Sequence, residues 1–490
     1  MITDPAEQAV LAAVPQGLLL GGTWRPASGG ARFDVVDPSS GEPIAAVADG
    51  TLDDARAAIE IADATQAAWA ATAPRVRGEV LRKAYELMIE RLEPLALLMT
   101  LEMGKPLAES RSEVAYAADF FRWFSEEAVR MTGTWSTAPD GQSRLWTMKQ
   151  PVGPCLLVTP WNFPLAMGTR KLGPALAAGC TAIVKPAKQT PLSMLALGGI
   201  LMEAGLPQGV LTILPTTNSS GVVAQLMKDP RLRKLSFTGS TEVGQALVRQ
   251  SADRMLRLSM ELGGNGPFIV FADADLDRAA DEAMRAKLRN NGEACTAANR
   301  FYVEESVRAE FVARLHSRFA AISVGRGTDA SNGLGPLIDQ AAVDKVTELV
   351  GAATAAGATI DYAGDIPAAS GGYYYPPTIV DGVPADSRLV TEEIFGPVAP
   401  VVGFETEEQV LGWVNGSDYG LASYLFTADL ARALRMAERI EAGMIGLNRG
   451  VLSNVAAPFG GIKLSGYGRE GGDEGLDEYL ETKYVAVDVS

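Results

Sequence analysis

The sequence predicts an α/β fold whose first large unit is a Rossmann-type parallel sheet. Short apolar runs alternate with helical stretches over most of the 490 residues, and this alternation is typical of βαβ units with right-handed crossovers. Hydrophobic residues make up 47% of the chain and charged residues 21%, which is the balance of an ordinary globular protein. A chain of this length predicts about three domain-sized units.

The N-terminal part is predicted to be mainly helical. Thr51 is followed by two aspartates and then by apolar residues at helical spacing, which indicates a helix N-cap. Two further helical stretches are expected over residues 74–103 and 108–131. After a turn-rich connection, polar and apolar residues alternate over Arg144–Gln150, which predicts a strand with one exposed face.

Strand and helix alternate most regularly in the middle of the chain. Helices are expected to begin near residues 170, 191, 219 and 241. The predicted strands of this parallel sheet are Cys155–Thr159, Thr181–Lys185, Val210–Leu214, Lys234–Thr238 and Arg257–Met260. A second alternating block runs from Pro267 to Gly446. The tail, 479–489, alternates again as a strand of a kind that often pairs with a partner subunit.

Charge and composition argue against several functions. A net charge of -16 argues against a nucleic-acid partner and against binding to an anionic membrane. The N-terminal residues carry no basic or long apolar segment, and no apolar stretch approaches the length of a membrane span. Three cysteines provide no disulfide framework, so a reducing cytoplasm is the expected location. Two of them, Cys155 and Cys180, lie in apolar strand contexts and are expected to be core residues.

The single histidine restricts the chemistry further. His316 lies in an amphipathic run, Phe311–Phe319, which is typical of the outer face of a helix. Nothing near it in the sequence supports a Ser-His-Asp or Cys-His mechanism. A Cys/His metal site is excluded on the same ground, so no metal is predicted.

Three residues at separate positions form a set suited to covalent chemistry on a carbonyl. Cys295 ends a charged helical stretch, Glu261 ends a strand-like run, and Asn162 follows another strand. A thiolate adds to the carbonyl carbon, a side-chain amide stabilises the oxyanion, and a carboxylate activates water. The alternative is an inert core thiol beside a carboxylate that caps a strand end.

Two weaker patterns indicate phosphate and ribose binding. The chain has no Gly-x-Gly-x-x-Gly sequence after its first strand, but Gly239 and Ser240 stand between a strand and a helix, where they suit a phosphate. Alone, that pattern is more often an ordinary strand-to-helix turn. Lys185 and Lys188 follow another parallel strand, where cofactor ribose groups are normally bound. Two lysines suit a phosphorylated ribose, and a solvated loop is the equal alternative.

Taken together, these stretches resemble the aldehyde dehydrogenase superfamily. The resemblance covers nearly the whole chain, and it is specific because seven motifs occur in the right order. The motifs are Pro160–Pro164, Lys185-Pro186, Phe237–Ser240, Glu261–Gly264, Gly292–Cys295, Glu392–Pro397 and Pro458–Gly461 with Ser465–Glu470.

The resemblance implies three domains. A cofactor-binding domain would comprise 1–129 and 149–259, and a catalytic domain would comprise 260–462. A small bridging β element from 130–148 and 463–490 would support a homodimer or a homotetramer.

The resemblance also implies a role for each catalytic residue. Cys295 would be the nucleophile, Glu261 the base for deacylation, and Asn162 would form the oxyanion hole with the Cys295 N–H. The thiolate adds to the aldehyde, a hydride leaves to a nicotinamide, and activated water releases the acid from a thioester. The implied cofactor residues are Thr159, Trp161, Lys185, Lys188, Gly239, Ser240, Leu262, Glu393 and Phe395.

Within the superfamily, the chain is most similar to succinic semialdehyde dehydrogenases. The stretches Ala166–Cys180, Glu261–Phe271 and Gly443–Asn448 carry this similarity. It implies that the far carboxylate of the substrate is bound by residues including two arginines, because guanidinium pairs with carboxylate in a bidentate geometry. The implied substrate residues are Arg170, Arg289, Ser453 and Phe459. Alternatively, Arg170 is a surface charge, Arg289 belongs to a structural salt bridge, and the substrate is glutaric semialdehyde or an uncharged aldehyde.

Three positions depart from the family pattern. Glu293 stands where the family usually has glutamine, and a carboxylate there would raise the pKa of the thiol if it pointed inward. Ala297 replaces the second cysteine of some relatives, so a local disulfide switch is not expected. Lys188 replaces the acidic residue that NAD-preferring relatives place on the ribose diol, which favours NADP and leaves NAD possible.

Two other functions stay open at this point. A non-catalytic protein that kept the fold is one, and acyl transfer to coenzyme A is the other. Intact Cys295, Glu261 and Asn162 disfavour the first, and a deacylating base at Glu261 disfavours the second.

Overall fold

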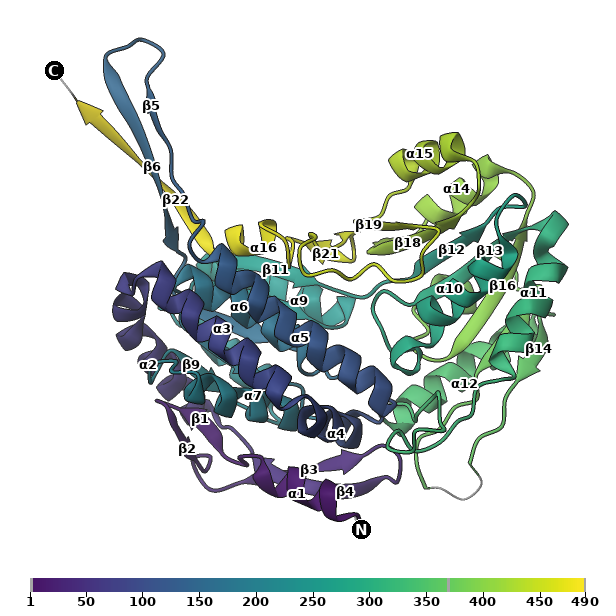
Figure 1. Ribbon diagram of the computed structural model, residues 1–490, viewed down its shortest axis with the longest axis horizontal. Coiled ribbons are helices and arrows are strands. Elements are labelled where there is room, and N and C mark those ends of the chain that lie inside the picture. The colour runs from purple at the N-terminus through teal and green to yellow at the C-terminus, as the bar shows by residue number, and fades with distance from the viewer. Residues whose placement is uncertain (1–2, 368–370, 489–490) are drawn as a thin grey trace.

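The computed structural model describes residues 3–367 and 371–488 and shows two α/β lobes with a projecting β arm (Figure 1). The first lobe contains an eight-stranded sheet. Five neighbouring strands at its centre, β9, β8, β7, β10 and β11, run parallel to one another. In spatial order its strands are β2 (Thr23–Arg25), β1 (Leu18–Leu20), β9 (Leu211–Ile213), β8 (Ala182–Lys185), β7 (Cys155–Val158), β10 (Lys234–Thr238), β11 (Arg257–Glu261) and β21 (Gly466–Tyr467).

Helices cover both faces of this first sheet, because its central strands are apolar on both sides. One face packs against α2 (Leu52–Ala71), α8 (Ser219–Lys228) and α9 (Thr241–Ser251). The other face packs against α3 (Pro74–Glu90), α4 (Leu92–Met103), α5 (Leu107–Glu127), α6 (Ala166–Ala178) and α7 (Leu192–Glu203). The remaining elements of this lobe are α1 (Pro5–Ala13), the hairpin β3 (Arg32–Asp37) and β4 (Glu42–Ala48), the 3-10 turn Ala252–Arg254, and α16 (Glu474–Asp477).

The second lobe contains a seven-stranded sheet. Its strands in spatial order are β14 (Thr359–Ala363), β15 (Thr378–Asp381), β16 (Val398–Phe404), β13 (Ala298–Glu304), β12 (Gly266–Val270), β18 (Ala422–Phe426) and β19 (Met444–Leu447). Alternate side chains of β12 enter different cores, with Phe268 facing α10 (Leu276–Leu288) and α11 (Glu305–Phe319). Ile269 faces the opposite core, which is formed by α12 (Gln340–Ala355), α13 (Arg388–Thr391), α14 (Glu407–Asn415) and α15 (Leu430–Arg439).

The projecting arm is a three-stranded antiparallel sheet that stands away from both lobes (Figure 1). It consists of β5 (Trp135–Thr137), β6 (Ser143–Pro151) and β22 (Leu480–Asp488). The C-terminal strand therefore pairs with β6 of its own chain, from Leu480 opposite Pro151 to Asp488 opposite Ser143. A small ladder pairs β17 (Tyr419–Gly420), just before β18 of the second lobe, with β20 (Ile462–Lys463), just before β21 of the first sheet.

The α/β fold class predicted from the sequence is confirmed. Each of the five predicted central strands lies within two residues of an observed strand, and α8 and α9 begin at the predicted residues. Thr51 caps α2 through a capping box with Asp54. The stretch predicted as one helix over 74–103 is two helices, because the chain changes direction at Arg91 (φ -106°, ψ 26°). The three domain ranges remain a proposal, and β21, assigned to the bridging element, pairs with β11 of the first sheet.

Two further observations concern the described residues only. Over 3–367 and 371–488, no helix combines the length and the apolar character needed to cross a membrane. The same part of the chain contains no group of three His, Cys, Asp or Glu residues arranged to hold a metal ion.

His316 lies on the exposed side of α11, where its Nδ1 contacts Asp361 Oδ2 at 2.9 Å.

Candidate active site

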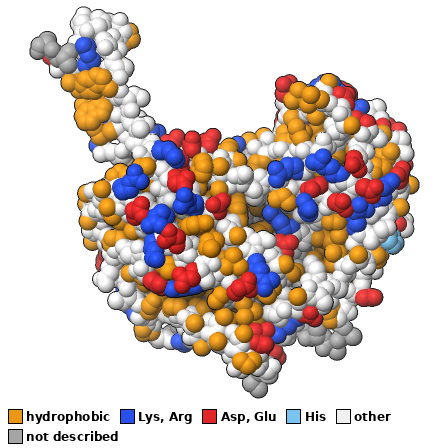
Figure 2. All heavy atoms as spheres, in the orientation of Figure 1, with side chains coloured by type: hydrophobic (Ala, Val, Ile, Leu, Met, Phe, Trp, Pro, Cys, Tyr) orange, Lys and Arg blue, Asp and Glu red, His pale blue; other side chains and the backbone are white. Residues whose placement is uncertain are grey.

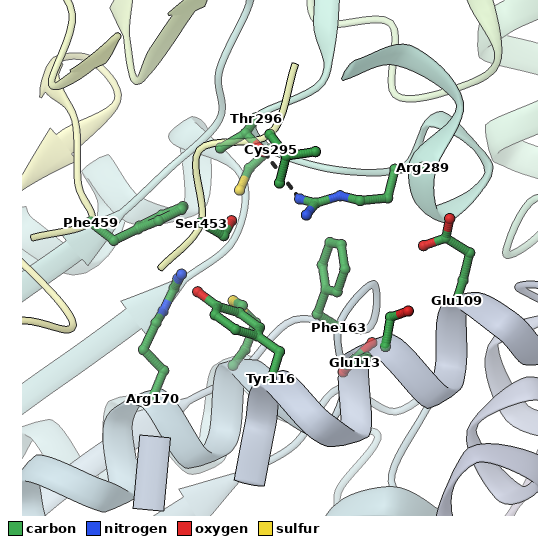
Figure 3. A pocket seen from close by; sticks show the side chains of 13 residues that line it. Glu109, Glu113, Tyr116, Phe163, Arg170, Arg289, Cys295, Thr296, Ser453 and Phe459 are labelled. Carbon is green, nitrogen blue, oxygen red and sulfur yellow. Dashed lines mark hydrogen bonds between the residues drawn. The ribbon is translucent and has the colours of Figure 1, made fainter. Parts of the chain in front are cut away.

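Two cavities meet at the thiol of Cys295. Cys295 and Met167 line both of them, so the sulfur is reached from two sides. The first cavity, of about 220 Å³, is lined by Glu109, Ser112, Glu113, Tyr116, Phe163, Met167, Arg170, Arg289, Cys295, Thr296, Val451, Ser453 and Phe459 (Figure 3). The second, of about 370 Å³, lies beside the ends of β10 and β11 and the N-terminus of α12. A group that reacts with two partners in turn needs this arrangement.

The loop before Cys295 is held in an unusual backbone conformation. Asn290 and Asn291 adopt left-handed φ values of 57° and 59° within the 3-10 turn Arg289–Gly292, a region that asparagine tolerates better than most residues. The Asn290 side chain donates to the carbonyl oxygens of Asn162 and Glu293 at 3.0 and 2.9 Å. The Cys295 loop and the Asn162 loop are therefore fixed relative to each other.

The Cys295 thiol is protonated at neutral pH in this environment. Burial raises its pKa to about 11, Arg170 opposes the shift, and Glu261 adds to it. The thiolate is the reacting species. A reaction that uses this sulfur as a nucleophile would therefore include removal of the thiol proton.

Glu261 lies at the end of β11 and is 2% exposed. Neither carboxyl oxygen has a hydrogen-bond partner in the described chain. Burial, and next the neighbouring Glu470, raise the pKa of Glu261 well above its usual range, while Arg170 lowers it. A buried carboxyl that is free of partners and easily protonated suits a general base.

Close backbone approach explains two motif glycines. A Cβ at Gly264 would lie 2.3 Å from the carbonyl oxygen of Cys295, and one at Gly460 would lie 2.8 Å from Oε1 of Glu261. Both distances are shorter than any van der Waals contact. The Glu261–Gly264 and Pro458–Gly461 segments can therefore pack around the nucleophile only with glycine at these positions.

Asn162 lies beside the loop that carries Cys295. Its Nδ2 donates to the carbonyl oxygen of Glu293 at 3.0 Å, which uses one of its two N–H groups. Its own carbonyl oxygen accepts from Lys105 Nζ at 2.8 Å, and Lys105 is buried in an ion pair with Glu113. Glu293 thus holds the side-chain amide and Lys105 holds the backbone carbonyl of the same residue, while one side-chain N–H stays available.

Glu293 is directed to a neighbouring backbone segment. Its Oε1 accepts from the N–H of Ile338 at 3.0 Å, and the charges that act on the Cys295 thiol belong to Arg170, Glu261, Glu393 and Arg289. Burial raises the pKa of Glu293 well above its usual range. The contact of Oε1 is one that a glutamine carbonyl oxygen could also make, while Oε2 has no hydrogen-bond partner among the described residues.

The first cavity gathers all four residues that were expected to bind the substrate. Arg170 is 1% exposed, and its guanidinium lies 4.0 Å from the centre of the Phe459 ring. Its Nε donates to Glu470 Oε2 at 2.5 Å, while Nη2 has no partner among the described residues. Arg289 Nη2 lies 3.5 Å from Thr296 Oγ1 and forms no ion pair in the described part of the chain. Ser453 faces the same space (Figure 3). The alternatives of a surface charge for Arg170 and a salt bridge for Arg289 do not fit this arrangement.

The second cavity contains six of the nine expected cofactor residues. Ser240 caps α9 at the cavity wall, with its Oγ 3.5 Å from the N–H of Val243. Glu393 accepts from the N–H of Gly264 at 3.0 Å, and burial raises its pKa to about 7. Phe395 has a left-handed φ of 57° and meets the Trp161 ring edge-on at 5.4 Å. The six residues are Trp161, Gly239, Ser240, Leu262, Glu393 and Phe395.

The other three lie at the ends of adjacent parallel strands. Thr159 follows β7 and donates its N–H to the carbonyl oxygen of Lys185 at 3.2 Å. Lys185 ends β8, its Nζ donates to Ser219 Oγ at 3.2 Å, and burial lowers its pKa to about 8. Lys188 is exposed on the turn beyond β8. These three residues do not line the second cavity.

Several cavity residues were not found from the sequence. In the first cavity they include Tyr116, whose buried hydroxyl lies beside Arg170 and Ser453, and Glu109 on the same helix face. In the second they come from the N-terminus of α12, and here the N-cap pattern at Asp339 was a usable signal. The missed lining residues are Glu109, Ser112, Glu113, Tyr116, Phe163, Met167, Thr296 and Val451 in the first cavity, and Ile338, Asp339, Ala341, Ala342 and Lys345 in the second.

Comparison with known proteins gives one family. The model of the aldehyde dehydrogenase family matches residues 24–485. The chain is 55% identical to a succinate-semialdehyde dehydrogenase of Paenarthrobacter nicotinovorans, over 91% of this chain and 98% of that protein. It is 45% identical to an NADP(+) succinate-semialdehyde dehydrogenase of Escherichia coli, covering 96% and 98%. It is 47% identical to a glutarate-semialdehyde dehydrogenase of Pseudomonas aeruginosa, covering 95% and 96%.

A solved structure agrees with these relatives. The crystal structure of succinate-semialdehyde dehydrogenase from Burkholderia pseudomallei superposes with a TM-score of 0.96 at 43% sequence identity. The superposition covers 100% of both chains.

Proposed function

The chain belongs to the aldehyde dehydrogenase family, and on that premise we propose that it oxidises a short ω-carboxy aldehyde, succinic semialdehyde to succinate, with NADP as the preferred cofactor. One observation carries the choice of substrate. The cavity that opens onto Cys295 contains two arginines that no carboxylate in the described chain fully satisfies, Arg170 at Nη2 and Arg289. A buried guanidinium N–H without a partner is costly, and a substrate carboxylate would satisfy it.

We propose that the reaction proceeds through a covalent bond to Cys295. The thiolate adds to the aldehyde carbon, and the amide N–H of Asn162 with the N–H of Cys295 stabilises the oxyanion. Oxidation of this thiohemiacetal leaves a thioester. Glu261 then takes a proton from water, whose oxygen attacks the thioester carbon, and the acid leaves as the thiolate is restored.

The second cavity fits a dinucleotide. The N-terminus of α9, with Ser240 as its cap, suits a pyrophosphate, and the Glu393 carboxyl suits ribose hydroxyls. When bound, an oxidised nicotinamide supplies the hydride acceptor. Lys185 and Lys188, at the carboxyl end of β8, add positive charge suited to the extra phosphate of NADP, and use of NAD remains possible.

Glutaric semialdehyde is the second candidate substrate. The Pseudomonas aeruginosa relative is named for it at 47% identity, and the same two arginines suit a carboxylate that lies one methylene further from the aldehyde. A broad aldehyde dehydrogenase would have no use for two incompletely paired arginines in this cavity.

We also propose a homodimer or homotetramer. The arm exposes Trp135, Trp146 and Tyr484, with exposed fractions of 61%, 40% and 57%, and a small isolated sheet with exposed aromatic side chains is rarely stable alone. Leu430 and Leu434 form a second exposed apolar group. They lie on α15 of the second lobe, across the concave side of the molecule from the arm (Figures 1 and 2).

A cytoplasmic location is part of the same proposal. All three cysteines of the chain are free thiols, and the mechanism needs Cys295 reduced. A reducing compartment maintains that state.

The test measures reduced-cofactor formation with succinic semialdehyde and butanal, each with NADP and NAD. We expect kcat/KM to favour the semialdehyde, and we expect Arg289→Gln to raise KM for the semialdehyde about 10- to 100-fold. Butanal has no carboxylate, so its KM should stay unchanged in the variant. Equal wild-type efficiency on both aldehydes would replace the proposal with a broad aldehyde dehydrogenase.

A further inference from the structure

The first cavity contains acidic as well as basic side chains, and one of the acidic side chains has no role in the proposed reaction. Glu109 and Glu113 line the cavity together with Arg170 and Arg289. An acidic group in a cavity for a carboxylate works against binding unless its charge is neutralised by a partner. The two glutamates differ in this respect.

Glu113 is fully committed to the protein. Its Oε2 pairs with Lys105, and its Oε1 accepts from the N–H groups of Leu165 and Ala166 at 3.0 and 3.1 Å. Its side chain is 1% exposed. This carboxylate caps the start of α6 and presents no free charge to the cavity.

Glu109 has no such partners. In the described chain, no hydrogen bond or ion pair within 4 Å holds its carboxylate, and its side chain is part-buried. Burial raises the pKa of Glu109, while Arg289 and Lys105 oppose that shift, so both cations lie close enough to act on it. Its position in the first turn of α5 also favours the charged form.

The position of Glu109 in the cavity determines which substrates its charge would affect. Figure 3 shows Glu109 and Arg170 at opposite ends of the cavity, with the Cys295 sulfur nearer to Arg170 and the Arg289 guanidinium between the sulfur and Glu109. An aldehyde carbon bound at the sulfur leaves its carboxylate at a distance set by the chain length. Because Arg289 lies on the Glu109 side of the sulfur, an acid long enough to extend past Arg289 would bring its carboxylate toward Glu109.

We propose that Glu109 is a specificity-determining residue that limits the substrate to short ω-carboxy aldehydes, because its unpaired carboxylate competes with the substrate carboxylate for Arg289 and repels longer acids. This inference rests on the proposed function and addresses its open choice between four- and five-carbon substrates. A short acid reaches Arg170 and Arg289 without approaching Glu109. A longer acid meets a like charge.

The test compares kcat/KM for succinic, glutaric and adipic semialdehyde and for butanal in the wild type and in Glu109→Gln. Glutamine keeps the shape and removes the charge. We expect the efficiency with the two longer acids, relative to succinic semialdehyde, to rise by at least about 5-fold, which is what one pair of unit charges about 4 Å apart contributes even in bulk water. Butanal should change by less than about twofold, since it has no charge to repel.

Two variants control for other causes. Glu109→Asp keeps the charge and should keep the wild-type preference for short acids. Glu126→Gln makes the same charge change at the far end of α5, where Glu126 pairs with Arg122 at 2.7 Å, and should leave the chain-length profile unchanged.

The outcomes separate the two proposals. A wild-type preference for succinic semialdehyde over butanal, combined with an unchanged chain-length profile in Glu109→Gln, overturns the role of Glu109 alone. An equal gain on all four aldehydes in that variant does the same, because it indicates a change in packing. Equal wild-type efficiency on succinic semialdehyde and butanal overturns the proposed function, and the inference with it.

Discussion

The two cavities that meet at Cys295 are built in different ways. The residues that line the second cavity lie largely at strand ends, in glycine-containing turns and at helix N-termini. The first cavity consists of side chains from α5, α6 and the loop at 451–459. Residues at strand ends and helix N-termini are positioned by the fold itself, whereas side chains on a helix face change with single substitutions. On the proposed function, the fold sets cofactor binding and individual residues set the choice of aldehyde.

The largest expected effect is at the residue that the cavities share. Cys295→Ser removes the thiolate, so we expect kcat to fall by at least about 10⁴-fold, as for other catalytic nucleophiles. Both cavities should still bind their ligands. Fluorescence titration with the reduced dinucleotide measures the second cavity, and a matched Cys180→Ala variant tests whether the loss is specific to this thiol. A Cys295→Ser enzyme with substantial activity would contradict the covalent mechanism.

The next largest effect on kcat is expected at Asn162, a residue of the second cavity that is proposed to stabilise the oxyanion. Asn162→Ala removes the amide N–H and keeps the backbone carbonyl that Lys105 binds, so the loop should stay in place. We expect kcat to fall about 10²- to 10³-fold, with little change in KM for the cofactor. A rise in the cofactor KM without a fall in kcat would show that Asn162 belongs to binding and not to the oxyanion hole.

The pH dependence of kcat/KM should be the same for every aldehyde substrate. Catalysis needs Cys295 and Glu261 deprotonated, and both pKa values are raised, that of Cys295 to about 11. A raised pKa moves proton loss to higher pH, so kcat/KM should increase from pH 7 to 9, at most about tenfold per pH unit for each proton removed. The profiles with butanal and with the semialdehyde should have the same shape. A flat profile over this range would mean that the thiol ionises near neutrality.

The smallest expected effect is confined to the cofactor. Lys188→Glu places a negative charge beside the proposed site of the NADP phosphate, so the ratio of kcat/KM with NADP to that with NAD should fall about tenfold. Lys228→Glu, an exposed charge reversal at the end of α8, is the matched control. The effect of Lys188→Glu on NADP and of Arg289→Gln on the semialdehyde should multiply in the double variant, because the two residues share no partner. Strong coupling would mean that the cavities are not independent.

The same comparison explains which site residues the sequence revealed. Gly239, Ser240, Glu393 and Phe395 occur in short motifs whose spacing follows from one strand end or turn, and the structure places all four at the second cavity. Glu109 and Tyr116 occur on a long amphipathic helix. Residues that face a cavity and residues that face a core follow the same helical period, so the pattern does not distinguish them.

The fold class, the central strands within two residues, the family and the three residues proposed for catalysis could be predicted without the structure, because they depend on local periodicity and ordered motifs. The direction of Glu293 and the pairing of Arg170 with Glu470 could not, because they depend on contacts between distant parts of the chain. The same is true of Glu113, which is neutralised by a partner while Glu109 is not. The Arg170–Glu470 contact joins residues 300 positions apart, and charges so far separated in the chain acquire an energy only when folding buries them together.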